Sequence, residues 1–222
     1  EWLGLIEYLA APEGTTYGDK RANTGQTRPW TDEFDRIRIE YGNESWNPLF
    51  SPWDFADPKL YSAFAEYFFS VAKTSPYWEA IAHKVDFVVN GWFIQADSSG
   101  FGAQAATHSP SSSITDITAY VGGWEAGGSL AGELVSTAGF QATLAFGPRE
   151  YFPTVDAHVA TQGELHNAGR SYGLAVYEGG PGYDLPTAED PANAIQEIYG
   201  KSLVSATTTL DCFLYNATRG IS

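Results

Sequence analysis

Residues 36–47 read RIRIEYGNESWN. Over residues 36–41, charged side chains alternate with apolar or aromatic ones, and this period of two predicts a β-strand. Gly42 and Asn43 then favour a turn, because both residues tolerate the backbone conformations that tight turns require. The sequence therefore places the carboxylate of Glu44 in a turn just beyond the carboxyl end of a strand.

A helix follows this strand. Asp57 and Pro58 are typical of a helix N-terminus, and the apolar spacing after them predicts a helix that stops before Pro76. The other predicted elements are helices over residues 1–10, 156–168 and 191–215, strands over 85–92, 117–121 and 172–177, and loops over 11–35 and 95–115. Strands that alternate with helices predict an α/β fold with a parallel sheet. Both an open doubly wound sheet and part of a (β/α)8 TIM barrel fit this pattern.

The composition excludes several classes of protein. Hydrophobic residues make up 43% of the 222 residues, which supplies one sizeable core. Lys and Arg number 12 against 27 Asp and Glu, and the net charge of −15 would repel nucleic acid and an anionic bilayer. A single cysteine, Cys212, and four scattered His residues predict neither an internal disulfide nor a zinc site. We therefore expect no nucleic acid, no membrane and no metal as partners.

Two predicted strands end in similar sequences. The first runs into residues 42–47, and the last runs into residues 177–182, which read YEGGPG. Each of these stretches has one Glu beside amide, indole or phenol groups, which suit the hydroxyls and the apolar face of a sugar. Two carboxylates that face one cleft are what glycosidic cleavage requires: one protonates the leaving oxygen, and the other attacks or activates water.

These two stretches carry a resemblance to a known family. Residues 38–46 resemble the Asn-Glu acid/base motif at the end of the fourth strand in the large clan of retaining (β/α)8 glycoside hydrolases, and Tyr177-Glu178 is similar to the nucleophile position that ends that clan's seventh strand. The resemblance implies that Glu44 is the general acid/base and Glu178 the nucleophile. It also implies that Asn43 binds the sugar 2-hydroxyl and that Tyr120 hydrogen-bonds the nucleophile.

The resemblance also defines the expected reaction. Gly-Asn-Glu is closest to arabinofuranosidase-like and xylosidase-like members, so we expect cleavage of O-glycosidic bonds in a plant or algal type polysaccharide or oligosaccharide, without a cofactor. A retaining mechanism implies carboxyl groups ~5–5.5 Å apart. A non-catalytic carbohydrate-binding or pseudo-enzyme domain on the same barrel is the alternative. Because such substrates lie outside cells, we expect an extracellular or cell-surface location.

Four further residues are expected to contact the substrate: Trp46, Trp124, Tyr177 and His108. Other interpretations remain open at these positions, because tryptophan is common in protein cores and His108 suits an exposed loop. A solvated carboxylate is the alternative for Glu44. Glu40 competes with it, although a structural pair between Glu40 and Arg36 or Arg38 also fits the sequence.

The same resemblance predicts an incomplete barrel. If Glu44 ends the fourth strand, residues 1–10 form the third helix, and residues 219–222 stand where an eighth strand begins. We therefore expect residues 1–222 to form one catalytic barrel segment that lacks its N-terminal strands and its final strand. Open sheet edges and uncovered apolar helix faces are unfavourable in water, so the rest of the barrel or another chain is the expected partner.

Overall fold

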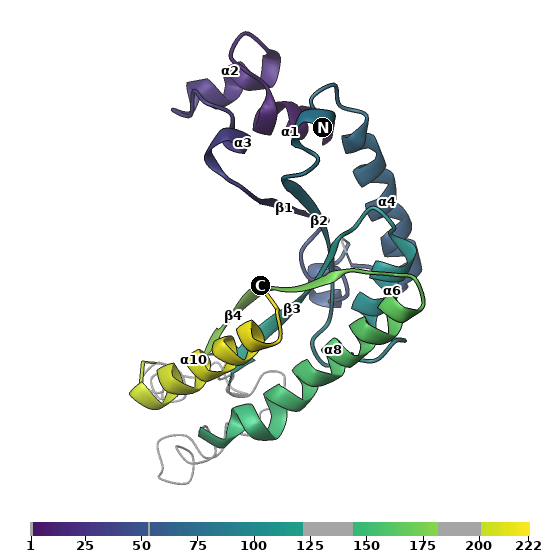
Figure 1. Ribbon diagram of the computed structural model, residues 1–222, viewed down its shortest axis with the longest axis vertical. Helices are drawn as coiled ribbons and strands as arrows, with labels where there is room; N and C mark the ends of the chain where they lie inside the picture. The colour runs from purple at the N-terminus through teal and green to yellow at the C-terminus, as the bar shows by residue number, and fades with distance from the viewer. Residues whose placement is uncertain (1, 53, 122–143, 182–200) are drawn as a thin grey trace. The chain divides into compact units, whose positions relative to one another are not determined.

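The computed structural model of the protein describes residues 2–52, 54–121, 144–181 and 201–222 (Figure 1). The strands in this part of the chain are β1 (Ile37–Glu40), β2 (Val85–Asn90), β3 (Ile114–Val121) and β4 (Gly173–Pro181). Their order in the sheet is also their order in the sequence, and β1 pairs with β2 in parallel. This order lacks the reversal that defines a doubly wound sheet and matches consecutive strands of a (β/α)8 barrel.

The chain forms two compact units. The first comprises Glu1–Asn90 and Gln104–Thr115, and the second comprises Gly91–Ala103 and Asp116–Ser222. In the part of the chain that the structure describes, none of the helices has the length and apolar character that crossing a membrane requires.

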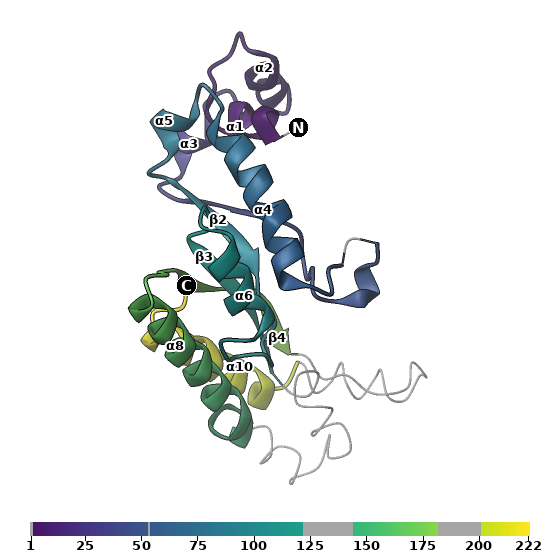
Figure 2. The ribbon, with the colours of Figure 1, turned by 90° about the vertical axis from the view of Figure 1, so that its right-hand side faces the viewer.

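The first unit is built around β1, β2 and the helix α4 (Pro58–Lys73) (Figure 2). The predicted N-terminus of α4 is confirmed, because the Asp57 side chain accepts a hydrogen bond from the Lys59 backbone N–H at 2.8 Å. The buried face of the helix packs on β2, where Phe69 stacks on Phe87 with 4.3 Å between ring centroids. The helix α1 (Trp2–Ala10), also as predicted, adds Trp2 to an aromatic cluster with Phe68 and Phe69.

The prediction of a loop over residues 11–35 is wrong. This stretch contains α2 (Thr16–Asn23) and α3 (Trp30–Glu33). The fully buried Arg21 explains the difference, because its guanidinium donates to the carbonyl oxygens of Tyr8, Gln26 and Thr27 and so ties this polar stretch together. A buried arginine that donates to three backbone carbonyl groups is a tertiary interaction that a local pattern does not reveal.

The prediction of a loop over residues 95–115 is also wrong. The helix α6 (Phe101–His108) lies within it, and β3 begins at Ile114 rather than at residue 117. The Ala and Gly residues that suggested a loop instead allow close packing: Ala105 is fully buried, and the Ser62 hydroxyl donates to its carbonyl oxygen at 3.2 Å. The serines after α6 bind the carboxylate of Glu66 on α4.

Three additional short elements and three bounds also differ from the prediction. The short helix α5 (Trp78–Ile81) and the turns η1 (Pro48–Phe50) and η2 (Gly147–Tyr151) are additional. The helix α8 (Phe152–Asn167) begins earlier than expected, and β4 continues to Pro181 instead of ending at residue 177. The helix α10 (Leu203–Thr218) begins after Ser202, its N-cap residue, so the expected helix does not extend through residues 201–202. The expected start of that helix, residues 191–200, lies outside the described residues.

In the second unit, α8 and α10 lie side by side (Figures 1 and 2). Their contact includes Phe152 and Tyr215, whose rings stack with 3.9 Å between centroids. At the end of the chain, the backbone of Ser222 donates to Leu174 and accepts from Val176 on β4. This is the hydrogen-bond pattern of a parallel neighbouring strand, and it lies where the sequence predicts an eighth strand to begin.

Candidate active site

Glu44 lies in a tight turn directly after β1. Gly42 has a φ of +82°, and a Cβ atom there would lie 2.3 Å from the Ser45 hydroxyl oxygen, so this position requires glycine. Glu44 itself has a φ of +45°, in the left-handed region that non-glycine residues rarely adopt. Such a conformation costs roughly 1–3 kcal/mol and persists only where the surrounding structure fixes it.

Asn47 fixes the half-buried Glu44 side chain from within the turn. Its amide nitrogen Nδ2 donates to Glu44 Oε2 at 2.7 Å, and its backbone N–H donates to the Glu44 carbonyl oxygen at 2.8 Å. The other end of the same amide, Oδ1, caps η1 by accepting from the Leu49 N–H at 3.0 Å. Because its oxygen is held by the cap, the nitrogen of the Asn47 side chain is aimed at the carboxylate of Glu44.

Glu40 has a structural role at the end of β1. Its carboxylate accepts a hydrogen bond from the side-chain amide of Asn90, the last residue of β2. Arg36 pairs instead with Asp86 of β2, with 3.4 Å between the guanidinium and the carboxylate. Of the two Glu residues near the end of this strand, Glu44 is therefore the one that projects from the turn.

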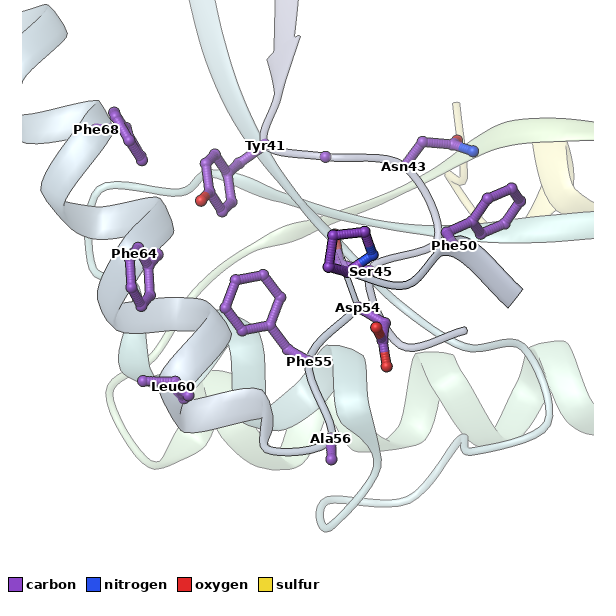
Figure 3. A pocket seen from close by; sticks show the side chains of 12 residues that line it. Tyr41, Asn43, Ser45, Phe50, Asp54, Phe55, Ala56, Leu60, Phe64 and Phe68 are labelled. Atoms are coloured by element: carbon purple, nitrogen blue, oxygen red, sulfur yellow. The ribbon is translucent and has the colours of Figure 1, made fainter. Parts of the chain in front are cut away.

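A large apolar cavity adjoins this turn. It has a volume of about 940 Å³ and is lined from three sides (Figure 3). Tyr41, Asn43 and Ser45 contribute from the turn, Phe55 from the segment before α4, and α4 itself contributes a row of apolar side chains. Burial raises the pKa of the Tyr41 phenol above its ordinary value, in keeping with this apolar surrounding. The residues of α4 that line the cavity are Leu60, Phe64 and Phe68.

The turn brings together three of the residues singled out from the sequence. Asn43 is exposed at the mouth of the cavity, and Glu44 and Trp46 are half-buried beside it. His108, in contrast, is the last residue of α6 rather than part of a loop, and its ring nitrogen Nδ1 lies 2.9 Å from the Gln104 carbonyl oxygen. Since α6 leads the chain back to the amino end of β3, its end lies away from the carboxyl strand ends where Glu44 is found.

Glu178 lies inside β4 and is half-buried. The next residue, Gly179, is packed against β3: a Cβ atom at this position would lie 2.8 Å from both the Cβ and the carbonyl oxygen of Ala119. Only glycine allows the two strands to approach so closely. Glu178 therefore belongs to the last part of β4, which continues through the two glycines after it instead of ending at residue 177.

This packing shows which side chains share a face of the sheet. Gly179 and Ala119 are neighbours on adjacent strands, and side chains alternate between faces along a strand. Glu178 and Tyr120 therefore project to the same face of the sheet. Tyr177 projects to the opposite face, so the structure does not bring it together with Glu178.

Trp124, expected to contact the substrate, lies outside the described residues. Within the described ranges, no three His, Cys, Asp or Glu side chains form a group that could hold a metal ion. The residues that sequence reasoning missed are Asn47 and Asn90; the only local signal for Asn90 is that a polar residue follows the apolar residues 87–89 of β2.

The fold and these two strand regions define the class of structure: an α/β chain whose consecutive parallel strands and intervening helices correspond to part of a (β/α)8 barrel.

No protein-family model and no curated protein matches the sequence. Solved structures do match. The whole chain is similar to AbfB, a family 51 α-L-arabinofuranosidase from Bifidobacterium longum, with a TM-score of 0.56 and 17% identity. A second similar structure is the family 51 (GH51) arabinofuranosidase from Xanthomonas axonopodis pv. citri, with a TM-score of 0.60 and 15% identity over 99% of this chain.

These similarities concern the fold. The chain spans 36% of the length of the first enzyme and 41% of the length of the second. At this level of identity they show that the chain has the fold of part of a glycoside hydrolase.

Proposed function

We propose that the protein is a glycoside hydrolase that cleaves O-glycosidic bonds with retention of configuration. The observation that carries the proposal is the pair of strand regions described above: Glu44 in a left-handed turn after β1, and Glu178 on the same face of the sheet as Tyr120. Both regions belong to a fold that the family 51 arabinofuranosidases also have. The proposed roles are general acid/base for Glu44 and nucleophile for Glu178.

The reaction proceeds in two displacements. In the first, the Glu178 carboxylate attacks the anomeric carbon while Glu44 donates a proton to the departing glycosidic oxygen, which leaves a covalent glycosyl-enzyme. In the second, Glu44 takes a proton from water, and the resulting nucleophile displaces Glu178 from the anomeric carbon. Each displacement inverts the configuration, so the product retains it.

Other residues have supporting roles in this proposal. The exposed Asn43 amide binds the 2-hydroxyl of the sugar, and the Tyr120 phenol donates a hydrogen bond to Glu178. Trp46 offers an aromatic face to the sugar, and Trp124 keeps the role that the sequence predicts. Tyr177 and His108 are left out, because Tyr177 faces the other side of β4 and His108 ends α6.

The proposed substrate class is α-L-arabinofuranosides of plant or algal type polysaccharides or oligosaccharides, since both similar structures are named as arabinofuranosidases. An extracellular or cell-surface location follows from such a substrate. The chain has 27 acidic and 12 basic residues. This negative net charge is compatible with a neutral sugar as the substrate, but it does not identify the sugar.

The test is hydrolysis of 4-nitrophenyl glycosides by the purified protein and by the Glu178→Gln variant. We expect release of nitrophenol from the α-L-arabinofuranoside, with the β-D-xylopyranoside as the second substrate, and a loss of activity in the variant. Activity that survives Glu178→Gln would remove Glu178 as the nucleophile. Sugar binding without any hydrolysis by either protein would favour the alternative, a carbohydrate-binding domain.

We also propose that further polypeptide, which supplies the remaining barrel strands, covers the cavity beside the turn. Phe64 and Leu60 on α4 are 46% and 52% exposed, and the cavity that they line is mostly apolar. Exposed apolar patches of this kind mark interaction sites. Phe64→Lys is expected to abolish co-purification of the protein with that polypeptide; unchanged co-purification would contradict the proposal.

A further inference from the structure

Asn90, at the end of β2, is fully buried and uses both ends of its side-chain amide. Its oxygen Oδ1 accepts a hydrogen bond from the Ser45 backbone N–H at 3.0 Å, and its nitrogen Nδ2 donates to the carboxylate of Glu40. A backbone N–H can only donate and an ionised carboxylate can only accept, so this orientation of the amide is the one that satisfies both partners. Asn90 therefore connects the end of β1, and the turn after it, to β2.

The position of Asn90 is itself fixed from α4. The Asn90 backbone N–H donates to the hydroxyl of Tyr61 at 2.9 Å, and that hydroxyl donates to the Tyr41 carbonyl oxygen at 2.7 Å. Tyr61 is fully buried, so no water competes for these bonds. Three elements, β1, β2 and α4, thus meet at one residue whose side chain points to the turn.

The contact with Ser45 acts directly on Glu44. The peptide group between Glu44 and Ser45 is held at both ends: its N–H donates to Asn90 Oδ1, and its C=O accepts from the Asn47 N–H at 2.8 Å. This peptide group directly follows the residue with a φ of +45°. Loss of the Asn90 acceptor would leave a buried N–H without its partner and would allow the Glu44 backbone to relax toward a common conformation.

We propose that Asn90 is a positioning residue for the acid/base: it holds the Glu44–Ser45 peptide group so that the Glu44 carboxyl stays aimed at the glycosidic oxygen. This inference rests on the proposed function. A displacement of a catalytic group by 1 Å can cost roughly a hundredfold in rate. A misaligned acid lowers kcat/KM only for substrates whose leaving group needs protonation. A comparison of good and poor leaving groups therefore tests the role of Asn90 directly.

The experiment compares kcat/KM for a phenyl and a 2,4-dinitrophenyl glycoside of the sugar that the protein hydrolyses. Phenolate is a poor leaving group and needs the acid, whereas dinitrophenolate departs without it. For Asn90→Ala we expect a loss of roughly 30- to 100-fold on the phenyl substrate and of less than about 3-fold on the dinitrophenyl substrate. Asn90→Ser, whose hydroxyl is too short to reach Ser45, is measured in parallel and decides the result if the alanine variant does not fold.

Two further variants are the controls. Ser62→Ala removes the hydrogen bonds from another buried α4 side chain to the Pro58 and Ala105 carbonyl oxygens, neither of which belongs to the turn, so any loss should be equal on both substrates. Glu40→Gln keeps an acceptor oxygen for Asn90 Nδ2 and leaves the bond between Asn90 and Ser45 in place, so it should retain the ratio between the substrates. A loss of equal size on both substrates in Asn90→Ala or Asn90→Ser, or no loss at all, would overturn the positioning role.

The same assay on a Glu44 variant distinguishes a failure of the proposed function from a failure of the positioning role of Asn90. Glu44→Gln should itself show the selective loss on the phenyl substrate, by roughly 10²–10⁴-fold. If Glu44→Gln hydrolyses both substrates like the parent protein, the acid/base assignment fails. If Glu44→Gln is selective and the Asn90 variants are not, only the role of Asn90 is removed.

Discussion

The two proposed catalytic carboxylates are held in place by different means. Glu44 lies beyond the last residue of β1, in a turn where hydrogen bonds from Asn47 and to Asn90 fix its side chain and backbone. Glu178 lies inside β4, where the close approach of Gly179 to Ala119 packs this strand against β3. Hydrogen bonds within a turn thus contribute to the position of Glu44 and strand packing contributes to that of Glu178, so the two regions should respond differently to substitution.

The largest expected effect is on the rate of hydrolysis, which should fall when either proposed catalytic carboxylate is removed. Glu178→Ala should lower the rate of hydrolysis by on the order of a thousandfold or more, and Glu44→Ala should lower it by roughly 10²–10⁴-fold on substrates with poor leaving groups.

Added azide should restore turnover in both variants, but the two glycosyl azide products should have opposite anomeric configurations. In Glu178→Ala it attacks the substrate directly and gives a glycosyl azide of inverted configuration, whereas in Glu44→Ala it attacks the glycosyl-enzyme and gives the retained anomer. NMR of the two azides measures this, and the same anomer from both variants would contradict the assignment.

The next largest effect concerns the packing around Glu178. Gly179→Ala forces β4 away from β3, because the new Cβ would lie 2.8 Å from two atoms of Ala119. We expect the free energy of unfolding to fall by about 1–3 kcal/mol. Gly163→Ala in α8 is the matched control: no atom lies within 4 Å of the added methyl group, and the helix should gain up to about 1 kcal/mol. Denaturant titration compares them, and equal stabilities of the two alanine variants would show that β4 is not fixed by this contact.

A smaller effect should separate the two roles of Asn47 in the turn. Asn47→Ala removes both the cap of η1 and the donor to Glu44, and should lower the free energy of unfolding by about 1 kcal/mol. Asn47→Ser keeps a neutral capping oxygen but removes the amide donor to Glu44. We therefore expect Asn47→Ser to keep its stability while it loses activity on the phenyl glycoside; a loss of stability without a loss of activity would show that Asn47 only caps the turn.

The smallest expected effect is a pH dependence of stability within the unit that contains β4. His158 is buried in α8, and its Nε2 lies 2.8 Å from the Phe93 carbonyl oxygen. Burial lowers the pKa of His158, and the hydrogen bond to Phe93 opposes this in part. Because the unfolded chain binds the proton first, His158 should contribute a loss of stability as the pH falls below about 6.5, and no change above it.

His158→Gln isolates this contribution. The glutamine amide can donate to the same carbonyl oxygen but does not titrate, so the Tm of this variant should fall less than that of the parent protein between pH 7.5 and 5.5. The two proteins are compared by thermal unfolding at both pH values. Parallel Tm curves would show that His158 does not contribute to the pH dependence.

Much of the fold could be predicted from local patterns. The alternation before Gly42 and the cap at Asp57 gave β1 and the start of α4, because both signals act over a few residues. The stretch around Arg21 was misread as a loop because its helices depend on a buried guanidinium that binds carbonyl groups elsewhere in the chain. The alanines of α6 were misread because small residues suit both loops and closely packed helices.

The candidate site was predictable to a similar extent. Gly42 and Asn43 indicated a turn with Glu44 in it, and the structure contains that turn. The contact between Asn90 and Ser45 joins residues 45 positions apart, and no local pattern reveals it. Tyr177 was expected to contact the sugar because its phenol suits a sugar face; the continuation of β4 places its side chain and that of Glu178 on opposite faces of the sheet.

The central claim is that Glu178 is the nucleophile of a retaining glycosidase, and covalent trapping tests it most directly. A 2-fluoro aryl glycoside slows the second displacement and so allows the glycosyl-enzyme to accumulate, after which digestion and mass spectrometry locate the label. The account predicts one fluoroglycosyl group per chain, attached to Glu178. A label on any other residue, or turnover of aryl glycosides with no covalent label, would contradict it.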